Sequence, residues 1–225
     1  MNSDIQILHA VNKHLESLLN YKSTFQSLFK KITKHGDVLL FGGAIRDILV
    51  NKTPRDYDFV VTFRSSFLEE ILASFAFWKN RFGGYKFVLD DIKIDIWSID
   101  DTWAFRNRLV SSLPDNLTET VFLNIDSIAV NLCRGNVYAK RYREAVEKNL
   151  LDIVLEKNPF PELCVLRALV FRCTNNINIS KKLREFIVNW KHSVDAPVDR
   201  LCSIQRRGGK NILSRYQIIE QLSQF

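Results

Sequence analysis

The sequence predicts an α+β fold, in which a mixed sheet flanked by helices is followed by an α-helical segment. Short apolar runs with the alternation of strands are concentrated before residue 140. From Arg141 onward the apolar residues recur at helical spacing. Helices are expected there over residues 162–173, 180–191 and 211–223. These patterns predict one domain over residues 1–140 and a helical domain over residues 141–225.

The elements of the first domain follow from the same periodicities. Apolar side chains at helical spacing predict helices over residues 4–20 and 23–33. Apolar or alternating runs predict strands over residues 38–41, 58–62, 85–89, 93–98 and 121–132. The dipeptide Asp90-Asp91 is expected to join two of these strands into a hairpin. Residues 100–120 are polar and irregular, and a mobile loop is expected there.

The composition narrows the class of protein. Apolar residues make up 46% of the 225 positions, which is enough for a packed core. The 4 cysteines lie far apart, without the spacing of a zinc site or a disulfide framework. There is no signal-peptide pattern and no apolar run of about 18 residues, so a cytoplasmic protein without a membrane partner is expected. The net charge of +7 favours a polyanionic partner without establishing one.

The most informative segment is FGGAIRDILVNKTPRDYDFVV, residues 41–61. A strand runs into Gly42-Gly43, a helix follows, and the next strand carries Asp56 and Asp58. Residues two apart in a strand face the same side, and two neighbouring carboxylates repel each other unless a cation lies between them. A Gly-Gly turn that opens a helix lets phosphates approach backbone N–H groups. Nucleotidyl transfer requires this combination, and a surface turn after Pro54 is the alternative interpretation of the two carboxylates.

These motifs, GGxxRD and then RDxDF, closely resemble the signature of the head domain shared by class II CCA-adding enzymes and bacterial poly(A) polymerases. That domain belongs to the DNA polymerase β-like nucleotidyltransferase superfamily. The resemblance is close over residues 38–62, continues more weakly to about residue 175, and does not cover residues 176–225. It implies a polymerase β-like nucleotidyltransferase head, an α-helical neck, an NTP as substrate, and Mg²⁺ or Mn²⁺ as the metal.

The resemblance also assigns roles to particular residues. Asp56 and Asp58 match the metal-binding and catalytic carboxylates, and Asp95 is the candidate for a third carboxylate on a neighbouring strand. Lys93, Asp95 and Trp97 share one side of that strand, which is either the site face or the solvent face. The residues expected to contact the nucleotide are Gly42, Gly43, Arg46 and Arg167.

Each of those nucleotide contacts has a structural alternative. Gly42 and Gly43 also suit tight packing of strand against helix. Arg46 could pair with Asp47 or with a strand carboxylate, and Arg167 could form a structural ion pair.

Two departures from the family pattern affect the expected specificity. The family's Arg-Arg-Asp before the strand that matches Leu123–Asn131 is replaced by Thr120, Val121 and Phe122. Phe160, Pro161 and Cys164 stand where the family's EDxxR motif reads the incoming base. The chain also lacks the length for the body and tail domains of a CCA-adding enzyme. Retained carboxylates and lost base-reading residues predict a specificity other than CCA synthesis.

A basic segment in the second domain is the candidate RNA contact. Arg206, Arg207 and Lys210 lie in a loop with two glycines, which could hold a nucleic-acid backbone or form a solvated turn between helices. The aromatics Tyr85, Trp103 and Phe105 are expected in the core, and a stacking surface for a base is their alternative role.

The predicted function is metal-dependent transfer of a nucleoside monophosphate from an NTP to a hydroxyl group, with release of pyrophosphate. The favoured acceptor is the 3′ end of an RNA, with tRNA as one candidate. Two alternatives stay open. One is nucleotidylation of a protein or small molecule, as in a toxin- or defence-type transferase. The other is a catalytically silent module that binds nucleotide or RNA.

Overall fold

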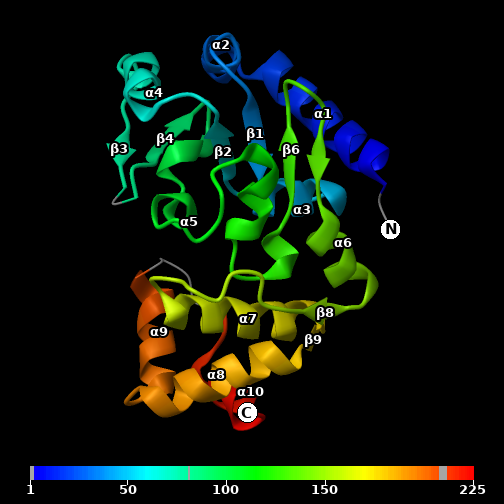
Figure 1. Cartoon of the computed structure of the whole chain (residues 1–225), viewed down its shortest axis with the longest axis vertical. Coiled ribbons are helices and arrows are strands. Elements are labelled where there is room, and N and C mark those ends of the chain that lie inside the picture. Colours follow the sequence, from blue (N-terminus) through cyan, green and yellow to red (C-terminus); the bar gives the residue numbers. More distant parts are fainter. Residues whose placement is uncertain (1–2, 81, 208–211) are drawn as a thin grey trace. The chain divides into compact units, whose positions relative to one another are not determined.

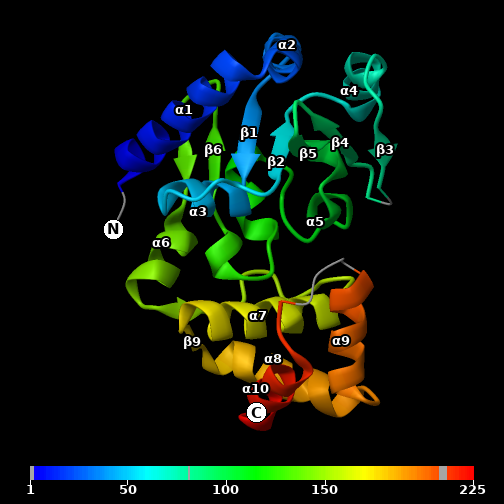
Figure 2. The same cartoon turned by 180° about the vertical axis from the view of Figure 1, so that it is seen from behind.

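A computed structural model describes residues 3–80, 82–207 and 212–225. The chain divides into two compact units. The first unit comprises Met1–Thr120 and Asp126–Arg143, and the second comprises Val121–Ile125 and Glu144–Phe225. Figures 1 and 2 show each unit from opposite sides. None of the helices in the described parts of the chain has both the length and the apolar character needed to span a bilayer.

The first unit is built on a mixed sheet (Figure 1). The described residues form seven strands in the order β3-β4-β5-β2-β1-β6-β7. Strands β2 and β5 run parallel, and the other neighbouring pairs are antiparallel. The bounds are β1 Val38–Phe41, β2 Tyr57–Val61, β3 Trp78–Lys79, β4 Tyr85–Leu89, β5 Ile92–Ser98, β6 Ala129–Asn131 and β7 Val137–Tyr138. The predicted α+β fold with a mixed sheet is therefore confirmed.

Helices cover one face of this sheet (Figure 2). These are α1 (Asp4–Tyr21), α2 (Ser23–Ile32) and α4 (Ser65–Leu72). Phe25 of α2 packs against Phe59 of β2 with ring centroids 6.1 Å apart. His14 of α1 forms a 2.7 Å hydrogen bond with the hydroxyl of Tyr57. Burial, together with the charge of Asp47, raises the pKa of Tyr57 to about 12, so that this hydroxyl keeps its proton.

The hairpin of β4 and β5 turns at Asp90-Asp91, as the sequence predicts. Both residues have positive φ, 48° and 67°, which suits a two-residue turn between twisted strands. The Asp90 carboxylate also accepts hydrogen bonds from the N–H groups of Thr24 and Phe25, at 2.9 and 3.1 Å. These N–H groups belong to the first turn of α2 and have no partner within the helix. Asp90 therefore joins the hairpin to α2.

The prediction of a loop over residues 100–120 is wrong. This segment forms the short helices η1 (Ile99–Asp101), α5 (Trp103–Arg106) and η2 (Pro114–Thr120). They cover the second face of the sheet, where a buried cluster forms from Leu39, Val60, Ile99, Phe105, Leu117 and Ala129. The apolar residues of the segment are few and irregularly spaced. Its sequence therefore shows no period, although it supplies Phe105 and Leu117 to this cluster.

The predicted strand over residues 121–132 is mostly absent. Only Ala129–Asn131 forms a strand, and Asn124–Asp126 forms the 3₁₀ turn η3. Residues 121–125 group with the second unit, where the side chain and backbone of Asn124 exchange hydrogen bonds with Asp152 at 2.9 and 3.0 Å. The chain leaves the sheet here because its backbone finds partners in the second unit.

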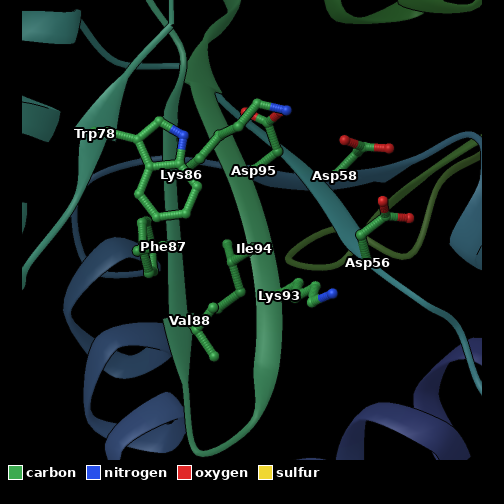
Figure 3. A pocket seen from close by; sticks show the side chains of 9 residues that line it. All are labelled: Asp56, Asp58, Trp78, Lys86, Phe87, Val88, Lys93, Ile94 and Asp95. Carbon is green, nitrogen blue, oxygen red and sulfur yellow. The ribbon is translucent and has the colours of Figure 1, made fainter. Parts of the chain in front are cut away.

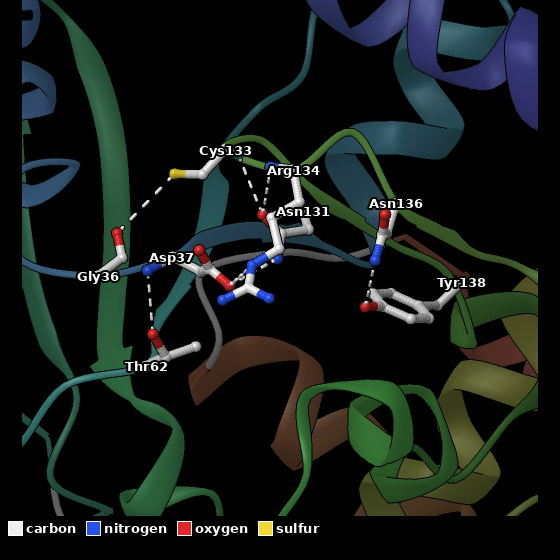
Figure 4. A network of polar contacts seen from close by, with 8 residues as sticks. All are labelled: Gly36, Asp37, Thr62, Asn131, Cys133, Arg134, Asn136 and Tyr138. Atoms are coloured by element: carbon white, nitrogen blue, oxygen red, sulfur yellow. Dashed lines mark hydrogen bonds and ion pairs between the residues drawn. The ribbon is translucent and has the colours of Figure 1, made fainter.

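A polar network fixes the start of β1 (Figure 4). The Asp37 carboxylate accepts a 3.1 Å hydrogen bond from the Asn131 side chain and forms a 2.6 Å ion pair with Arg134. The Asp37 N–H donates to the hydroxyl of Thr62 at 3.0 Å. The exposed arginine adds little to stability. The network nevertheless ties β1 to β2 and β6, which sets the register on which the candidate site depends.

The second unit is helical. Its main helices are α7 (Pro161–Asn175), α8 (Lys181–Ser193), α9 (Pro197–Arg207) and α10 (Arg215–Ser223). Helix α6 (Lys140–Glu147) spans the boundary of the two units, and β8 (Leu150–Leu151) pairs in parallel with β9 (Asn178–Ile179). Helix α9 is not predicted from the sequence, because its buried side chains are Leu201 and the polar Gln205. The Gln205 side chain bonds to Ile212 and Leu213, so this buried amide has a structural role.

Candidate active site

A row of side chains crosses the first unit's sheet in register. Trp78 of β3 pairs with Lys86 of β4, Lys86 with Asp95 of β5, Asp95 with Asp58 of β2, and Asp58 with Phe41 of β1. Directly paired residues of neighbouring strands project from the same face. The row therefore places two carboxylates side by side. Trp78 and Lys86 lie on one side of them, and the end of β1 lies on the other.

Asp56 adds a third carboxylate close to this row. It precedes β2 by one residue and lies two residues before Asp58. Asp56 and Asp58 are partly exposed, whereas Tyr57 and Phe59, which point to the helix-covered face, are buried. This alternation puts both carboxylates on the same side of the chain. Tyr57, which lies between the two carboxylates in the sequence, is held in place by its burial and by the hydrogen bond of its hydroxyl with His14.

The three carboxylates line one cavity of about 320 Å³, shown in Figure 3. Two lysines and one exposed tryptophan also line it. The full lining is Asp56, Asp58, Trp78, Lys86, Phe87, Val88, Lys93, Ile94 and Asp95. The cavity thus combines anionic, cationic and aromatic groups along strands β2 to β5.

The Asp95 carboxylate is largely buried, with 18% of its side chain exposed. One of its oxygens, Oδ2, lies 2.6 Å from the ammonium of Lys86. The other oxygen, Oδ1, is buried and accepts no hydrogen bond from the described residues. Burial raises the pKa of the Asp95 carboxyl; Lys86 opposes this shift and the negative charge of Asp56 adds to it. The site therefore holds an anion that lacks a partner on one side.

The carboxylates of the cavity are not preassembled around a metal ion. Within the described ranges, no three His, Cys, Asp or Glu side chains are arranged closely enough to form one metal-binding group. Asp56 instead pairs with Arg55 at 2.5 Å, and Asp95 pairs with Lys86. The donors themselves suit Mg²⁺, which prefers carboxylate oxygens and leaves other positions to water and phosphate. A cation would also supply the partner that Asp95 Oδ1 lacks, so the residues fit the ion chemically.

The Gly-Gly turn directly follows the row of paired residues. Gly42 has a φ of 69°, a left-handed conformation that favours glycine, and it caps α3 (Gly43–Leu49). A side chain at Gly43 would come within 3.3 Å of the guanidinium of Arg46. That guanidinium pairs with Asp126, and both side chains are largely buried. The structure thus places Arg46 in an ion pair with an aspartate that the sequence analysis does not consider.

The other predicted contact residues belong to the second unit. Arg167 lies on α7 with its guanidinium over the ring of Phe171, 5.8 Å from the ring centroid. Arg206 and Arg207 form the last turn of α9 and do not lie in a loop, which corrects their predicted setting. Lys210 lies outside the described residues.

The positions that replace the family's base-reading motif also lie in the second unit. Phe160 directly precedes α7, Pro161 is the first residue of α7, and Cys164 is buried. None of these three side chains can reproduce the charged pattern of an EDxxR motif.

The sequence-based predictions do not name the cavity residues Lys86 and Trp78. Lys86 lies on β4 and Trp78 on β3. The periodicity of a strand does not show which strands will pair with it, so the sequence does not place these two residues beside the carboxylates. Of the aromatics predicted as core residues, Tyr85 is 0% exposed and Phe105 is 6% exposed, whereas Trp103 is only partly buried. Trp78, which the sequence analysis does not single out, is 59% exposed. Only the structure shows that this tryptophan is exposed and that it lies beside the carboxylates.

Comparison with known proteins places this architecture among solved structures. No protein-family model and no curated protein matches the chain. The CCA-adding enzyme of Thermotoga maritima, complexed with tRNA, is similar with a TM-score of 0.62 and 15% identity over 93% of this chain and 53% of that one. A CCA-adding enzyme with ATP gives a TM-score of 0.64 and 16% identity over 97% and 53% of the two chains. A tRNA nucleotidyltransferase, complexed with a primer tRNA and an incoming ATP analog, gives 0.60 and 21% over 84% and 57%.

The fold is that of the nucleotidyltransferase head of CCA-adding enzymes. At these identities the likeness concerns the fold alone. The chain spans about half the length of the solved structures it matches.

Proposed function

We propose that this chain is a metal-dependent nucleotidyltransferase, which transfers a nucleoside monophosphate from an NTP to a hydroxyl group and releases pyrophosphate. The observation that carries the proposal is the in-register pair of Asp58 and Asp95, with Asp56 lining the same cavity. Two adjacent carboxylates repel each other, and Asp95 is largely buried with one oxygen that accepts no hydrogen bond from the described residues, so a bound cation would stabilise this part of the site.

Asp56, Asp58 and Asp95 would hold Mg²⁺ or Mn²⁺, which when bound neutralises the triphosphate and lowers the pKa of the attacking hydroxyl. The backbone at Gly42 and Gly43 receives the triphosphate, because neither residue has a side chain to keep phosphates away. Asp95 also accepts the proton of the attacking hydroxyl, a role suited to a carboxylate whose pKa is raised.

Two arginines are proposed to support nucleotide binding. Arg46 orders the start of α3 through its pair with Asp126 and thereby holds the Gly-Gly turn. Arg167 contributes a positive charge to nucleotide binding. Removal of either guanidinium should raise the KM for the NTP more than it lowers kcat, because Arg46 holds the turn that receives the triphosphate and Arg167 supplies positive charge for nucleotide binding.

The proposed acceptor is the 3′ end of an RNA, with tRNA as one candidate. Similar folds occur in proteins whose solved structures contain tRNA, and the net charge of +7 suits a polyanion. Phe160, Pro161 and Cys164 replace the charged base-reading motif, so the sequence added is expected to differ from CCA.

One set of incubations tests the reaction class and the acceptor together. The purified chain is mixed with Mg²⁺, total RNA and cell lysate, and with each α-³²P-labelled NTP in turn. Label in RNA supports the whole proposal. Label in protein or in a small molecule keeps the reaction class and overturns the acceptor. An absence of label that persists with Mn²⁺ overturns the enzyme assignment and favours a silent binding module. The Asp58→Asn variant serves as the blank, because it should transfer no label.

A further inference from the structure

Among the 4 tryptophans, all of which lie in the described parts of the chain, only Trp78 has an exposed side chain. Its exposed fraction is 59%, whereas Trp190 is 6% exposed and Trp97 and Trp103 are partly buried. The indole N–H of Trp97 donates to the hydroxyl of Thr102 at 3.1 Å, which gives that ring a structural partner. Among the described residues, the Trp78 ring makes no hydrogen bond, aromatic contact or cation–π contact. The fold therefore does not explain why a tryptophan stands at this position.

The position of Trp78 is also unusual for an apolar side chain. It lies on β3, the two-residue strand at one edge of the sheet, where proteins commonly place charged residues to prevent association. Val88, which lines the same cavity, is 50% exposed. Figure 3 shows the Trp78 ring beside the Lys86 side chain, on the side of the cavity opposite Asp56 and Asp58. An exposed aromatic face thus borders the carboxylates.

The order of the paired residues from Trp78 to Phe41 indicates on which side of the two carboxylates each substrate binds. Phe41, at one end, leads into the Gly42-Gly43 turn, and Trp78 stands at the other end. In phosphoryl transfer the attacking oxygen and the leaving oxygen are in line, on opposite sides of the phosphorus. If the triphosphate lies at the Gly-Gly turn, its pyrophosphate leaves on that side. The attacking hydroxyl then approaches from the side of Asp95 and Trp78.

We infer that Trp78 is the stacking surface for the 3′-terminal base of the acceptor strand. The inference rests on the proposed function, and it names the group that positions the acceptor. Trp78 lies two strands from Asp95, about 10 Å at the usual strand spacing, which one nucleotide can bridge between its base and its 3′-hydroxyl. Lys86 and Lys93 stand beside this path and suit the flanking phosphates.

Stacking also determines the specificity that the site can have. An indole stacks on any base, because every base has a π-face, so recognition of this kind tolerates sequence. The cavity lining on this side supplies Val88 and two lysines, which do not discriminate among bases by paired hydrogen bonds. The acceptor end is therefore selected as a single-stranded nucleic-acid end, whatever its terminal base.

Two short single-stranded RNAs, labelled with fluorescein at the 5′ end, test this inference. One has an ordinary 3′-terminal nucleotide, and the other has an abasic residue there. Fluorescence anisotropy without NTP or metal measures their affinities for the wild type, Trp78→Phe and Trp78→Ala. The wild type should bind the ordinary RNA at least about tenfold tighter than the abasic RNA, since stacking of one base supplies an effect of this size. Trp78→Ala should lose that preference, and Trp78→Phe should keep part of it.

Tyr21→Ala is the matched control, because Tyr21 is an aromatic residue of the same unit, 83% exposed, and outside the cavity. It should bind both RNAs as the wild type does. In transfer assays, Trp78→Ala should raise the KM for RNA about tenfold and leave the KM for NTP unchanged. Equal wild-type affinity for the two RNAs overturns the inference. A rise in the KM for NTP alone also overturns it, because the ring then contacts the incoming nucleotide.

The proposed function fails separately, through the labelled-NTP incubation. Transfer of label that depends on Asp58 but not on Trp78 leaves the enzyme assignment standing and refutes only the role of the indole.

Discussion

Asp58 on β2 and Asp95 on β5 are directly paired in a parallel register, so their carboxylates project side by side from one face of the sheet. Lys86 neutralises only one oxygen of Asp95, and the other oxygen is buried without a donor among the described residues. Such an arrangement opposes folding and is retained where it serves chemistry. Substitutions at this pair and at the residues around it should therefore change transfer activity, stability and metal binding.

Removal of the carboxylates should abolish transfer without unfolding the protein. Asp56→Ala and Asp58→Ala should each eliminate activity, because a metal ion loses a ligand. Asp95→Asn should lower kcat by about 10²–10⁴ and change NTP affinity less, as expected for a group that accepts the proton of the hydroxyl. Kinetics and thermal unfolding measure both effects. Asp100→Ala is the control, since Asp100 is exposed. Full activity in either alanine variant would show that the metal site is elsewhere.

The raised pKa of Asp95 predicts how stability depends on pH in the absence of metal. At pH values between the ordinary pKa of 3.8 and the raised pKa of the folded chain, this carboxyl is protonated to a larger extent in the folded chain than in the unfolded chain. Its contribution to the free energy of unfolding therefore falls as the pH rises through that window. The Asp95→Asn variant has no carboxyl to ionise, so its free energy of unfolding does not fall in this way. Denaturant unfolding should show the variant to be more stable than the wild type at pH 7, with no gain below pH 3.8. A variant that is less stable at pH 7 would contradict this account.

Lys86 should compete with a metal ion for Asp95. In Lys86→Met the 2.6 Å ion pair is removed, and Asp95 becomes fully available to a cation. The rise in melting temperature on addition of Mg²⁺ or Mn²⁺ should therefore be larger in this variant than in the wild type. Lys93→Met, at another cavity lysine, is the control and should respond as the wild type does. An unchanged metal response in Lys86→Met would mean that the ion does not displace this lysine.

The replaced base-reading residues predict an outcome on tRNA. With Phe160, Pro161 and Cys164 at those positions, the chain should not add C, C and A in order to a tRNA that lacks its 3′ end. Apolar side chains cannot form paired hydrogen bonds to the edge of a base, so selection between CTP and ATP has no basis there. Sequencing of the extended tRNA 3′ ends measures this. Efficient ordered addition of CCA would refute the prediction.

The basic residues Arg206, Arg207 and Lys210 predict a salt-dependent contribution to RNA binding. The charge reversals Arg206→Glu, Arg207→Glu and Lys210→Glu should weaken RNA binding together and leave NTP binding near normal. The slope of log affinity against log salt should fall by about one unit for each phosphate that the variant no longer binds. The control reverses three exposed lysines of the first unit, Lys13, Lys30 and Lys34. Equal effects of the two triple variants would indicate a general influence of net charge.

Some of the candidate site could be predicted because it depends on neighbours in the sequence. The face shared by Asp56 and Asp58, and the face shared by Lys93, Asp95 and Trp97, follow from the period of two in any strand. The Asp90-Asp91 hairpin follows from turn chemistry alone. Each of these features is decided by a few consecutive residues.

Other features depend on pairing between distant segments. The short helices from η1 to η2 resemble a loop in sequence because Ile99, Phe105 and Leu117 have no regular spacing, although they meet in one cluster. Helix α9 has no clear apolar period because its inner face carries Gln205, whose amide satisfies the backbone of Ile212 and Leu213. In both cases the stabilising partners are supplied by other parts of the chain.

The sequence alone determined the two strands around Gly42-Gly43, the shared side of Asp56 and Asp58, and the α+β class, because backbone periodicity is local. Only the tertiary structure decided that β5 lies next to β2, which brings Asp95 beside Asp58. It also decided that Trp78 ends the same row and that Lys86 neutralises Asp95. Strand order and register are set by hydrogen bonds between segments far apart in the chain and by the side chains that each sheet face can bury, and neither is encoded in any short stretch of residues.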